Sequence, residues 1–384
     1  MNNTVVDYYK HLCSEWNFTP TAPVSTGYES VEPQLKSLSK QRWESENEAG
    51  KQAIEQEVFD IYREVDVLPI TYYTLDGCVS ELKSIAGKSA AVEYGSIGVG
   101  NTAGQSFCRF WFPNMQEARN LKDKEASLRS RFYNDTKLRR AIQLCYKHRN
   151  EGDRSVLPQN IRRALDLVCG GSIQNFKPMS ARAVYEEICP QMFGRLLDFS
   201  SGYGGRMLGA LTSSMRYHYT GIDPNTKTYH GLDALGHLLT DLGLGGGFDM
   251  NHTVSEEFDA EPGTFDAAFS SPPYFNLEIY SDEPTQCMNR CSNLDAWFEL
   301  YVEPTLRMLH KVLAQDAIYA VNIADYKINQ TSFEIEQRWK ELSTKLNFKY
   351  ERDIKMMLNV RPGNGNNKLQ NGHKHELIYV FRKV

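Results

Sequence analysis

The chain has 384 residues, of which 41% are hydrophobic and 24% are charged, and its formal net charge is −5. This composition is ordinary for a globular protein and argues against a wholly basic nucleic-acid coat, although a local basic face stays possible. The length predicts two domains at roughly 100–200 residues each, and the absence of a long apolar run or a signal-like N-terminus predicts a soluble, cytoplasmic protein with no membrane partner.

The first 170 residues predict a mainly helical α+β domain. Residues 1–25 indicate an irregular lead-in, and residues 28–66 have apolar positions at three- and four-residue steps that are typical of a helix. Residues 67–113 contain two aromatic and β-branched runs, LPITYYTL and SFCRFWF, which predict strands on either side of a Gly- and Ser-rich loop. Residues 117–170 favour helices again.

Lysine and arginine are concentrated between residues 119 and 149, with aromatic residues interleaved. A charge run is usually a solvated helix face, but a local basic excess in an acidic chain also fits contact with nucleic-acid phosphates. The candidate contacts are Arg129, Arg131, Lys137, Arg139, Arg140, Lys147 and Arg149.

From about residue 176 the chain alternates between predicted strands and helices. Strands are expected over residues 194–200, 217–224, 248–255, 265–271 and 317–325, with helices over 204–214, 228–243, 294–313 and 332–346. The last residues, from 348 onward, predict an antiparallel pair joined by a Gly- and Asn-rich loop. This alternation predicts a mostly parallel sheet covered by helices, with an antiparallel edge.

Two of the predicted strands end in an acidic residue. Asp198 is followed by a glycine-rich turn, in which Gly202 and Gly204 allow close approach of a ligand or simply tight packing. The spacing is not the dinucleotide pattern GxGxxG, so pyrophosphate binding is not favoured. Asp223, with Pro224 after it, ends the next strand, where a carboxylate can accept both hydroxyls of a ribose.

A third strand is followed by Ser271-Pro272-Pro273-Tyr274. Two prolines end the strand and hold the chain rigid and extended, which aims carbonyl groups into the cleft at the carboxyl edge of the sheet. The Ser271 oxygen and the Pro272 carbonyl can accept the two hydrogens of an exocyclic amino group, while Tyr274 stacks on the ring. This set suits a flat substrate that carries an amino group.

The motifs together resemble those of the S-adenosylmethionine-dependent amino methyltransferases of DNA, which methylate cytosine N4 or adenine N6. The resemblance covers about residues 175–384 and implies a Rossmann-like class I fold with a mostly parallel seven-stranded sheet and an antiparallel C-terminal hairpin. It implies catalytic roles for Ser271, Pro272, Pro273 and Tyr274. It implies a cofactor site made of Phe176, Lys177, Pro178, Asp198, Phe199, Ser200, Gly202, Gly204, Asp223, Pro224, Ser255 and Ser270.

The resemblance also implies S-adenosyl-L-methionine as cofactor, no metal, and duplex DNA as partner, with the target base flipped out and received by Tyr274 and Phe275. Serine at the first motif position favours cytosine N4, with adenine N6 as the alternative. The catalytic domain is expected over residues 171–384, and target recognition falls by elimination to residues 1–170. An RNA or protein amino methyltransferase and a non-catalytic nucleic-acid-binding protein stay open as alternatives. A prokaryotic or phage-encoded enzyme, with or without a restriction partner, is expected.

Overall fold

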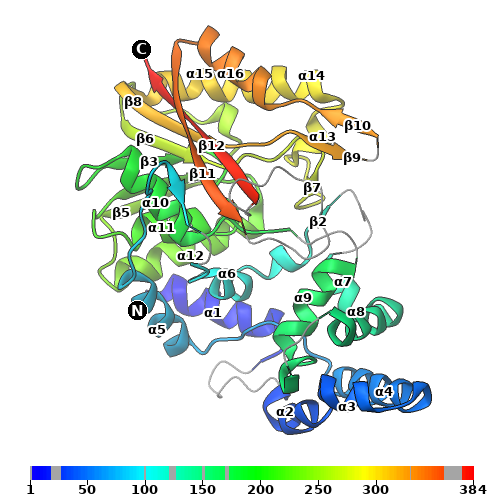
Figure 1. The fold of residues 1–384 in the computed structure, drawn as a ribbon. Coiled ribbons are helices and arrows are strands. Elements are labelled where there is room, and N and C mark those ends of the chain that lie inside the picture. The colour runs from blue at the N-terminus through cyan, green and yellow to red at the C-terminus, as the bar shows by residue number, and fades with distance from the viewer. Residues whose placement is uncertain are drawn as a thin grey trace.

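The computed structural model describes residues 2–18, 27–98, 101–120, 127–148, 152–168, 173–328, 330–358 and 374–384. Its centre is an eight-stranded sheet in the order β1-β11-β12-β8-β6-β3-β4-β5 (Figure 1). The strands of this sheet are β1 (Ser96–Ile97), β3 (Arg195–Asp198), β4 (His218–Ile222), β5 (Gly247–Asn251), β6 (Phe265–Ser270), β8 (Leu313–Asn322), β11 (Phe348–Leu358) and β12 (Lys374–Lys383).

The pairing of the strands confirms the predicted fold class. Strands β8, β6, β3, β4 and β5 run parallel to one another, whereas β12 lies antiparallel to both β8 and β11. Seven strands therefore form the expected Rossmann-like sheet with an antiparallel C-terminal hairpin. The eighth, β1, comes from the N-terminal half and pairs parallel with β11, at a place where the sequence predicts only a loop.

Helices cover both faces of the sheet (Figure 1). One face carries α10 (Pro178–Ile188), α11 (Gly205–Leu211) and α12 (Thr226–Asp241), and the other carries α14 (Leu294–Trp297), α15 (Glu303–Val312) and α16 (Glu336–Lys345). Successive strand residues point to opposite faces, so the fully buried Leu196 and Leu197 belong to two different hydrophobic clusters. Each such leucine contributes roughly 2 kcal/mol by leaving water.

Two of the helices predicted in the C-terminal half differ from the prediction: one is interrupted and the other is shorter. The helix expected over residues 294–313 is broken by a π-helical segment, Phe298–Val302, between α14 and α15. The helix expected over residues 332–346 begins only at Glu336, because Thr331–Phe333 forms strand β10 with β9 (Tyr326–Ile328). A short helix, α13 (Cys287–Arg290), lies in the segment between β6 and α14.

The N-terminal half is mainly helical, as predicted. Its helices are α1 (Asn3–Glu15), α2 (Tyr28–Ser37), α3 (Lys40–Ser45), α4 (Glu48–Val65), α5 (Leu75–Ala86), α6 (Gln105–Trp111), α7 (Leu128–Tyr133), α8 (Asp135–His148) and α9 (Pro158–Val168). Short 3₁₀ segments in this half span Pro113–Gln116 and Gly152–Arg154, and another, Ser255–Glu257, lies between β5 and β6 in the C-terminal half. The domain boundary expected near residue 170 stays a prediction, since residues 169–172 lie outside the described chain.

The irregular lead-in predicted for residues 1–25 is wrong over its first part. The Asn2 side chain accepts a hydrogen bond from the Thr4 N–H and caps α1. Val5, Tyr9 and Leu12 follow at four- and three-residue steps and are buried. The helical period was present in the sequence, but Pro20, Pro23 and the serine and threonine residues of the same stretch suggested a loop.

The two strands predicted within residues 67–113 are also wrong. The first run leads into α5, which begins after the N-cap Thr74. The second run forms α6, in which Phe107, Cys108, Phe110 and Trp111 are all buried. A helix that is enclosed on most sides lacks the polar face that reveals helical periodicity, and tertiary packing here overrides the β-propensity of its aromatic residues.

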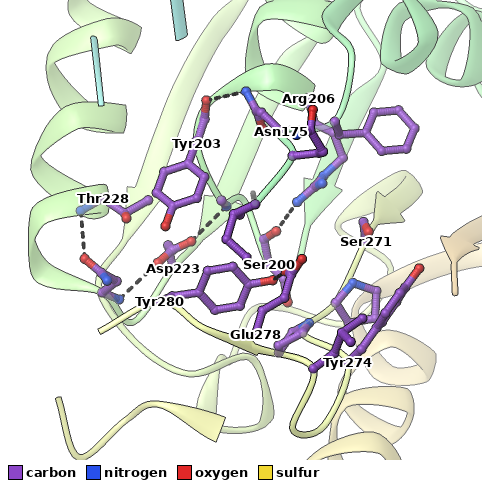
Figure 2. Close-up of a pocket in the computed structure, with 18 of the residues that line it drawn as sticks. Asn175, Ser200, Tyr203, Arg206, Asp223, Thr228, Ser271, Tyr274, Glu278 and Tyr280 are labelled. Carbon is purple, nitrogen blue, oxygen red and sulfur yellow. Dashed lines mark hydrogen bonds between the residues drawn. The ribbon is translucent and has the colours of Figure 1, made fainter. Parts of the chain in front are cut away.

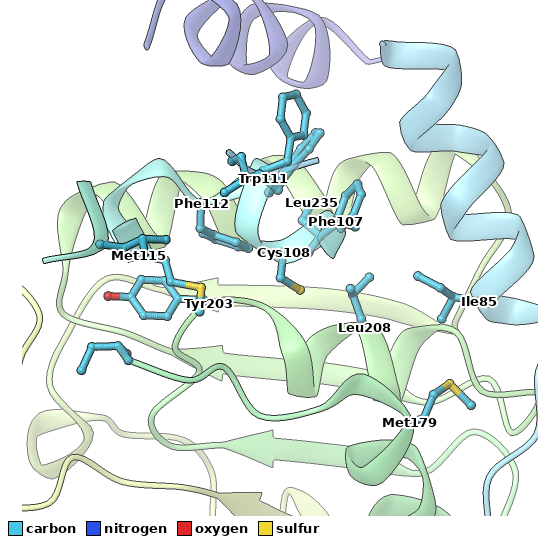
Figure 3. Packing of buried hydrophobic residues seen from close by; sticks show 14 of the residues in the cluster. Ile85, Phe107, Cys108, Trp111, Phe112, Met115, Met179, Tyr203, Leu208 and Leu235 are labelled. Carbon is cyan, nitrogen blue, oxygen red and sulfur yellow. The ribbon is translucent and has the colours of Figure 1, made fainter. Parts of the chain in front are cut away.

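The N-terminal half packs directly on the sheet and its helices. Phe107, Trp111 and Phe112 lie over Tyr203, Leu208 and Leu235 (Figure 3), and one buried cluster runs from Val5 to Val380. Polar contacts join the same surfaces: Trp111 Nε1 donates to the Gly231 carbonyl at 2.9 Å. A two-stranded sheet of β2 (Arg119–Asn120) and β7 (Glu278–Ile279) adds a second link. No helix among the described residues is long and apolar enough to span a membrane.

Candidate active site

A cavity of about 1150 Å³ lies at the carboxyl ends of the parallel strands, where ligands bind in open α/β sheets. Its wall brings together the glycine-rich loop after β3, the turn after β4 and the proline motif after β6. The predicted site residues that line it are Phe176, Lys177, Phe199, Ser200, Gly202, Asp223, Pro224, Ser255, Ser271, Pro272, Pro273 and Tyr274. The sheet topology thus places motifs that are far apart in the sequence on one shared cavity.

Asp198 does not reach this cavity, in contrast to its prediction. It is fully buried, and its carboxylate accepts hydrogen bonds from Arg206 Nε, Tyr219 and Ser270, each at 2.8 Å. A buried carboxylate with this many donors is a structural ion-pair centre rather than a free ligand group. Ser270 is likewise buried, and its hydroxyl donates a hydrogen bond to the Asp198 carboxylate. Its prediction as a cofactor contact is therefore wrong too.

Gly202 and Gly204 both have positive φ, +59° and +73°, but they serve different purposes. A Cβ on Gly202 would meet nothing closer than 3.9 Å, so this position faces open space in the cavity. A Cβ on Gly204 would lie 2.7 Å from the Phe112 ring. Of the two predicted explanations for Gly204, the structure therefore favours tight packing, here against the N-terminal half, over close approach of a ligand.

Pro178 is buried outside the cavity wall, although the sequence placed it in the cofactor site. It is the first residue of α10, where a fixed φ and a missing N–H cost nothing. The neighbouring Phe176 and Lys177 do line the cavity.

Asp223 ties the end of β4 to the glycine-rich loop (Figure 2). One carboxylate oxygen accepts the Gly202 N–H at 2.8 Å, and the other accepts the Asn225 N–H at 3.0 Å. Burial raises the pKa of Asp223 to about 7, against the opposing effect of these two N–H groups. The group lines the cavity and titrates near neutral pH.

Tyr203 is a cavity residue that the sequence analysis missed. Its hydroxyl is buried and has no hydrogen-bond partner in the described structure. Figure 2 shows Tyr203 beside Asp223 and Tyr280, and Asn175 Nδ2 donates to its backbone carbonyl at 2.8 Å. Buried hydroxyl groups are normally satisfied, so this one is suited to a ligand. Its position between two glycines of the loop was the only signal in the sequence.

The proline motif is held against the end of β8. Ser271 Oγ lies 3.4 Å from both the backbone and the side-chain oxygen of Asn322, and the Tyr274 hydroxyl donates to the Asn322 carbonyl at 3.3 Å. The Tyr274 ring is nearly parallel to Tyr326, with centroids 6.2 Å apart. Both hydroxyl groups thus have long hydrogen bonds to Asn322, the Tyr274 hydroxyl also interacts with Ser271, and the Tyr326 ring helps to orient Tyr274.

Phe275 does not face the cavity, so its predicted role in receiving a base is wrong. It has a φ of +24° and is buried, with its ring 6.1 Å from that of Phe333. The chain turns after Tyr274 and directs Phe275 into the hydrophobic cluster below the motif.

Beside the motif the cavity wall is acidic. Glu278 and Glu376 both line it, and the Tyr280 hydroxyl donates to the Glu278 carboxylate. Burial, followed by the charge of Glu376, raises the pKa of Glu278, although the bond from Tyr280 opposes this. Glu278 follows the motif closely in the sequence, whereas nothing in the sequence indicated that β12 would begin beside the motif and bring Glu376 there.

The predicted nucleic-acid contacts within the described residues lie outside the cavity wall, and they differ in burial. Arg131 is buried, with Nη1 3.5 Å from the Leu165 carbonyl, so it is not available to a phosphate. Arg129 lies over the Trp16 ring and Arg139 over the Phe59 ring. Lys137 is half-buried, Arg140 and Lys147 are exposed, and Arg149 lies outside the described residues.

Comparison with known proteins gives likeness in fold only. No family model and no curated protein matches the chain. Among solved structures, the [4+2]-cyclase SpnF matches at 14% identity and a TM-score of 0.35, over 46% of this chain and 59% of the cyclase. The Burkholderia thailandensis 1,6-didemethyltoxoflavin-N1-methyltransferase matches at 16% and 0.36, over 54% and 77%. A putative RNA methyltransferase from Pyrococcus horikoshii matches at 12% and 0.33, over 54% and 83%. Likeness of this degree says nothing about reaction or substrate.

Proposed function

We propose that the protein is an S-adenosylmethionine-dependent methyltransferase that modifies the exocyclic amino group of a base in DNA, with cytosine N4 as the preferred target. The observation that supports it most is the shared cavity: Ser271–Tyr274, the loop at Gly202 and the carboxylate of Asp223 all line it. A transfer reaction needs donor and acceptor sites within one enclosed space.

The cavity residues fit the proposed cofactor. Asp223 offers a carboxylate for ribose hydroxyls, Gly202 leaves open space, and the unpartnered Tyr203 hydroxyl offers a further polar contact. Near Ser255, one oxygen of Glu256 is also buried without a partner. When bound, the cofactor supplies an electrophilic methyl group on a sulfonium.

The residues of the proline motif would position the substrate. The Ser271 oxygen and the Pro272 carbonyl accept the two amino hydrogens, which keeps the nitrogen lone pair available for attack. Tyr274, held by Asn322, presents its ring to the base. These hydrogen bonds strengthen as positive charge develops on the nitrogen, so the contribution is one of positioning and electrostatics.

The direct test is mass spectrometry of nucleosides from DNA incubated with the protein and S-adenosylmethionine. N4-methylcytosine is the expected product. N6-methyladenine alone would refute the base assignment and leave the class standing, whereas methylation confined to RNA or protein would refute DNA as substrate.

A separate thermal-shift measurement tests the cofactor. An increase in melting temperature with S-adenosylmethionine or S-adenosylhomocysteine is expected, because a ligand that binds only the native state stabilises it. No shift at millimolar ligand would favour a nucleic-acid-binding protein without catalysis.

A further inference from the structure

Three arginines line the cavity on the side formed by the N-terminal half. Arg109 belongs to α6, and Arg162 and Arg163 belong to α9. Every charged side chain that the described part of this half contributes to the cavity wall is an arginine. None of the three was singled out by the sequence, in which the basic run of α7 and α8 was the stronger signal.

The three guanidinium groups are close enough to influence one another. Burial lowers the pKa of Arg109 to about 10, and the charges of Arg162 and Arg163 add to this while Asp166 opposes it. Arg162 Nη1 pairs with Asp166 at 2.9 Å, both being largely buried. Asp166 offsets part of this positive charge, and the charge that remains at a partly buried surface favours the binding of an anion.

The two halves contribute charge to the cavity wall differently. Among the described residues, the charged side chains from the N-terminal half are the three arginines, whereas the C-terminal half contributes Lys177, Arg206 and Arg290 as well as Asp223, Glu256, Glu278 and Glu376. Because Glu278 and Glu376 beside the proline motif would repel an anion, the negative phosphate of a nucleotide is expected on the arginine side and its neutral base beside the motif. Arginine also binds phosphate in a bidentate geometry that lysine does not offer.

We infer that Arg109, Arg162 and Arg163 bind the backbone phosphates of DNA next to the target nucleotide, while the base occupies the side of the cavity formed by Ser271–Tyr274. This inference rests on the proposed function for the base site. It assigns the phosphate contact to α6 and α9 rather than to the exposed basic residues of α8.

The test is binding of a fluorescent mixed-sequence DNA duplex, measured by anisotropy over a series of salt concentrations. Arg109→Gln and Arg163→Gln should each weaken binding about tenfold and reduce the slope of log K against log salt by about 0.9, the value for one phosphate contact. Arg163 is exposed, so its replacement leaves folding intact even if that of half-buried Arg109 does not. Arg42→Gln, at an exposed position on α3 outside the cavity wall, is the matched control and should change neither value.

Equal slopes for Arg163→Gln and Arg42→Gln would overturn the inference. Competition by free deoxycytidine monophosphate as strong as that by the duplex would overturn it as well, because the ligand would then be a mononucleotide. Binding of RNA in place of DNA would overturn the DNA assignment. If the arginine variants lose DNA affinity and no base is methylated, the proposed function fails, together with the placement of the target base, and only the phosphate contact of the three arginines stands. Methylation with unchanged slopes would support the proposed function and overturn the phosphate contact.

Discussion

The two sides of the cavity are built in different ways. On the C-terminal side, short loops follow β3, β4 and β6 and carry one or two functional groups each. On the N-terminal side, side chains project from α6, which packs against α12 and the glycine-rich loop, and from α9, which packs against α7 and α8. The comparison teaches that the ends of parallel strands place residues by topology alone, whereas packed helices place them by the shape of the surfaces in contact.

The largest expected effect concerns the contact between the two sides. Gly204→Ala should lower the free energy of unfolding by about 3 kcal/mol, from an unfavourable positive φ plus overlap with the Phe112 ring. Gly243→Ala is the matched control: its φ is +68° with no atom within 4 Å, so it should cost only about 1 kcal/mol. Denaturant unfolding measures both. Equal losses would show that the Phe112 contact is unimportant.

The next prediction isolates the C-terminal side. Tyr274→Ala should lower turnover about 100-fold through loss of substrate positioning, with cofactor affinity changed less than about twofold. Tyr274→Phe keeps the ring and loses only the bond to the Asn322 carbonyl, so about a fivefold loss is expected. Steady-state kinetics and calorimetry provide the measurements. A fully active alanine variant would contradict the stacking role.

A smaller effect is expected from pH. Asp223 has a raised pKa of about 7, and its carboxylate form is the better acceptor for ribose hydroxyls. Cofactor affinity should therefore rise about tenfold between pH 6 and pH 8. Asp223→Asn should bind more weakly and show no such rise in calorimetry. A wild-type affinity that is flat across this range would contradict the assignment of Asp223.

The same titration predicts a stability change in the free protein, with the opposite direction. The native pKa of Asp223 lies above its unfolded value of 3.8, so the native state binds the additional proton between these values. The contribution of this group to stability is present below pH 4 and is lost as the pH rises toward 7. Comparing wild type with Asp223→Asn across this range, by denaturant unfolding, separates it from other carboxylates.

The smallest effect belongs to the exposed basic residues. Arg140 and Lys147 on α8 were predicted from the sequence as DNA contacts, but both lie outside the cavity wall. Their double replacement by glutamine should weaken duplex binding only about twofold, as expected for distant charges screened by salt. A loss larger than that of Arg163→Gln would reverse the ranking of the two regions.

The C-terminal half could largely be predicted because its strands are short, apolar and bounded by glycine, proline or acidic residues. Such boundaries drew attention to Ser271–Tyr274 and Asp223, and the structure places both on the cavity wall. Asp198 was not correctly placed, because the sequence does not show that Arg206 folds back onto it eight residues later. Whether a charged residue can bind a ligand depends on whether another residue of the fold already pairs with it.

The N-terminal half was harder to predict for a physical reason. The aromatic residues of α6 are enclosed on most sides, so their pattern lacks a polar face, and the helix was mistaken for a strand. Arg109 went unrecognised with it. The basic run at residues 119–149 was predicted to contact nucleic acid, but it includes Arg131, which is buried. Tertiary packing causes this burial, and local composition cannot reveal it.

The continuous buried cluster from Val5 to Val380 has a consequence for how this protein can diversify. A domain that is joined to its neighbour only by a flexible linker can be exchanged between proteins with little loss of stability. Here Phe112 sits against a backbone position that tolerates only glycine, so a graft of α6 onto another sheet would have to bring the matching loop with it. The two halves are therefore expected to change together during evolution, because a substitution on one side of their interface requires a compensating substitution on the other.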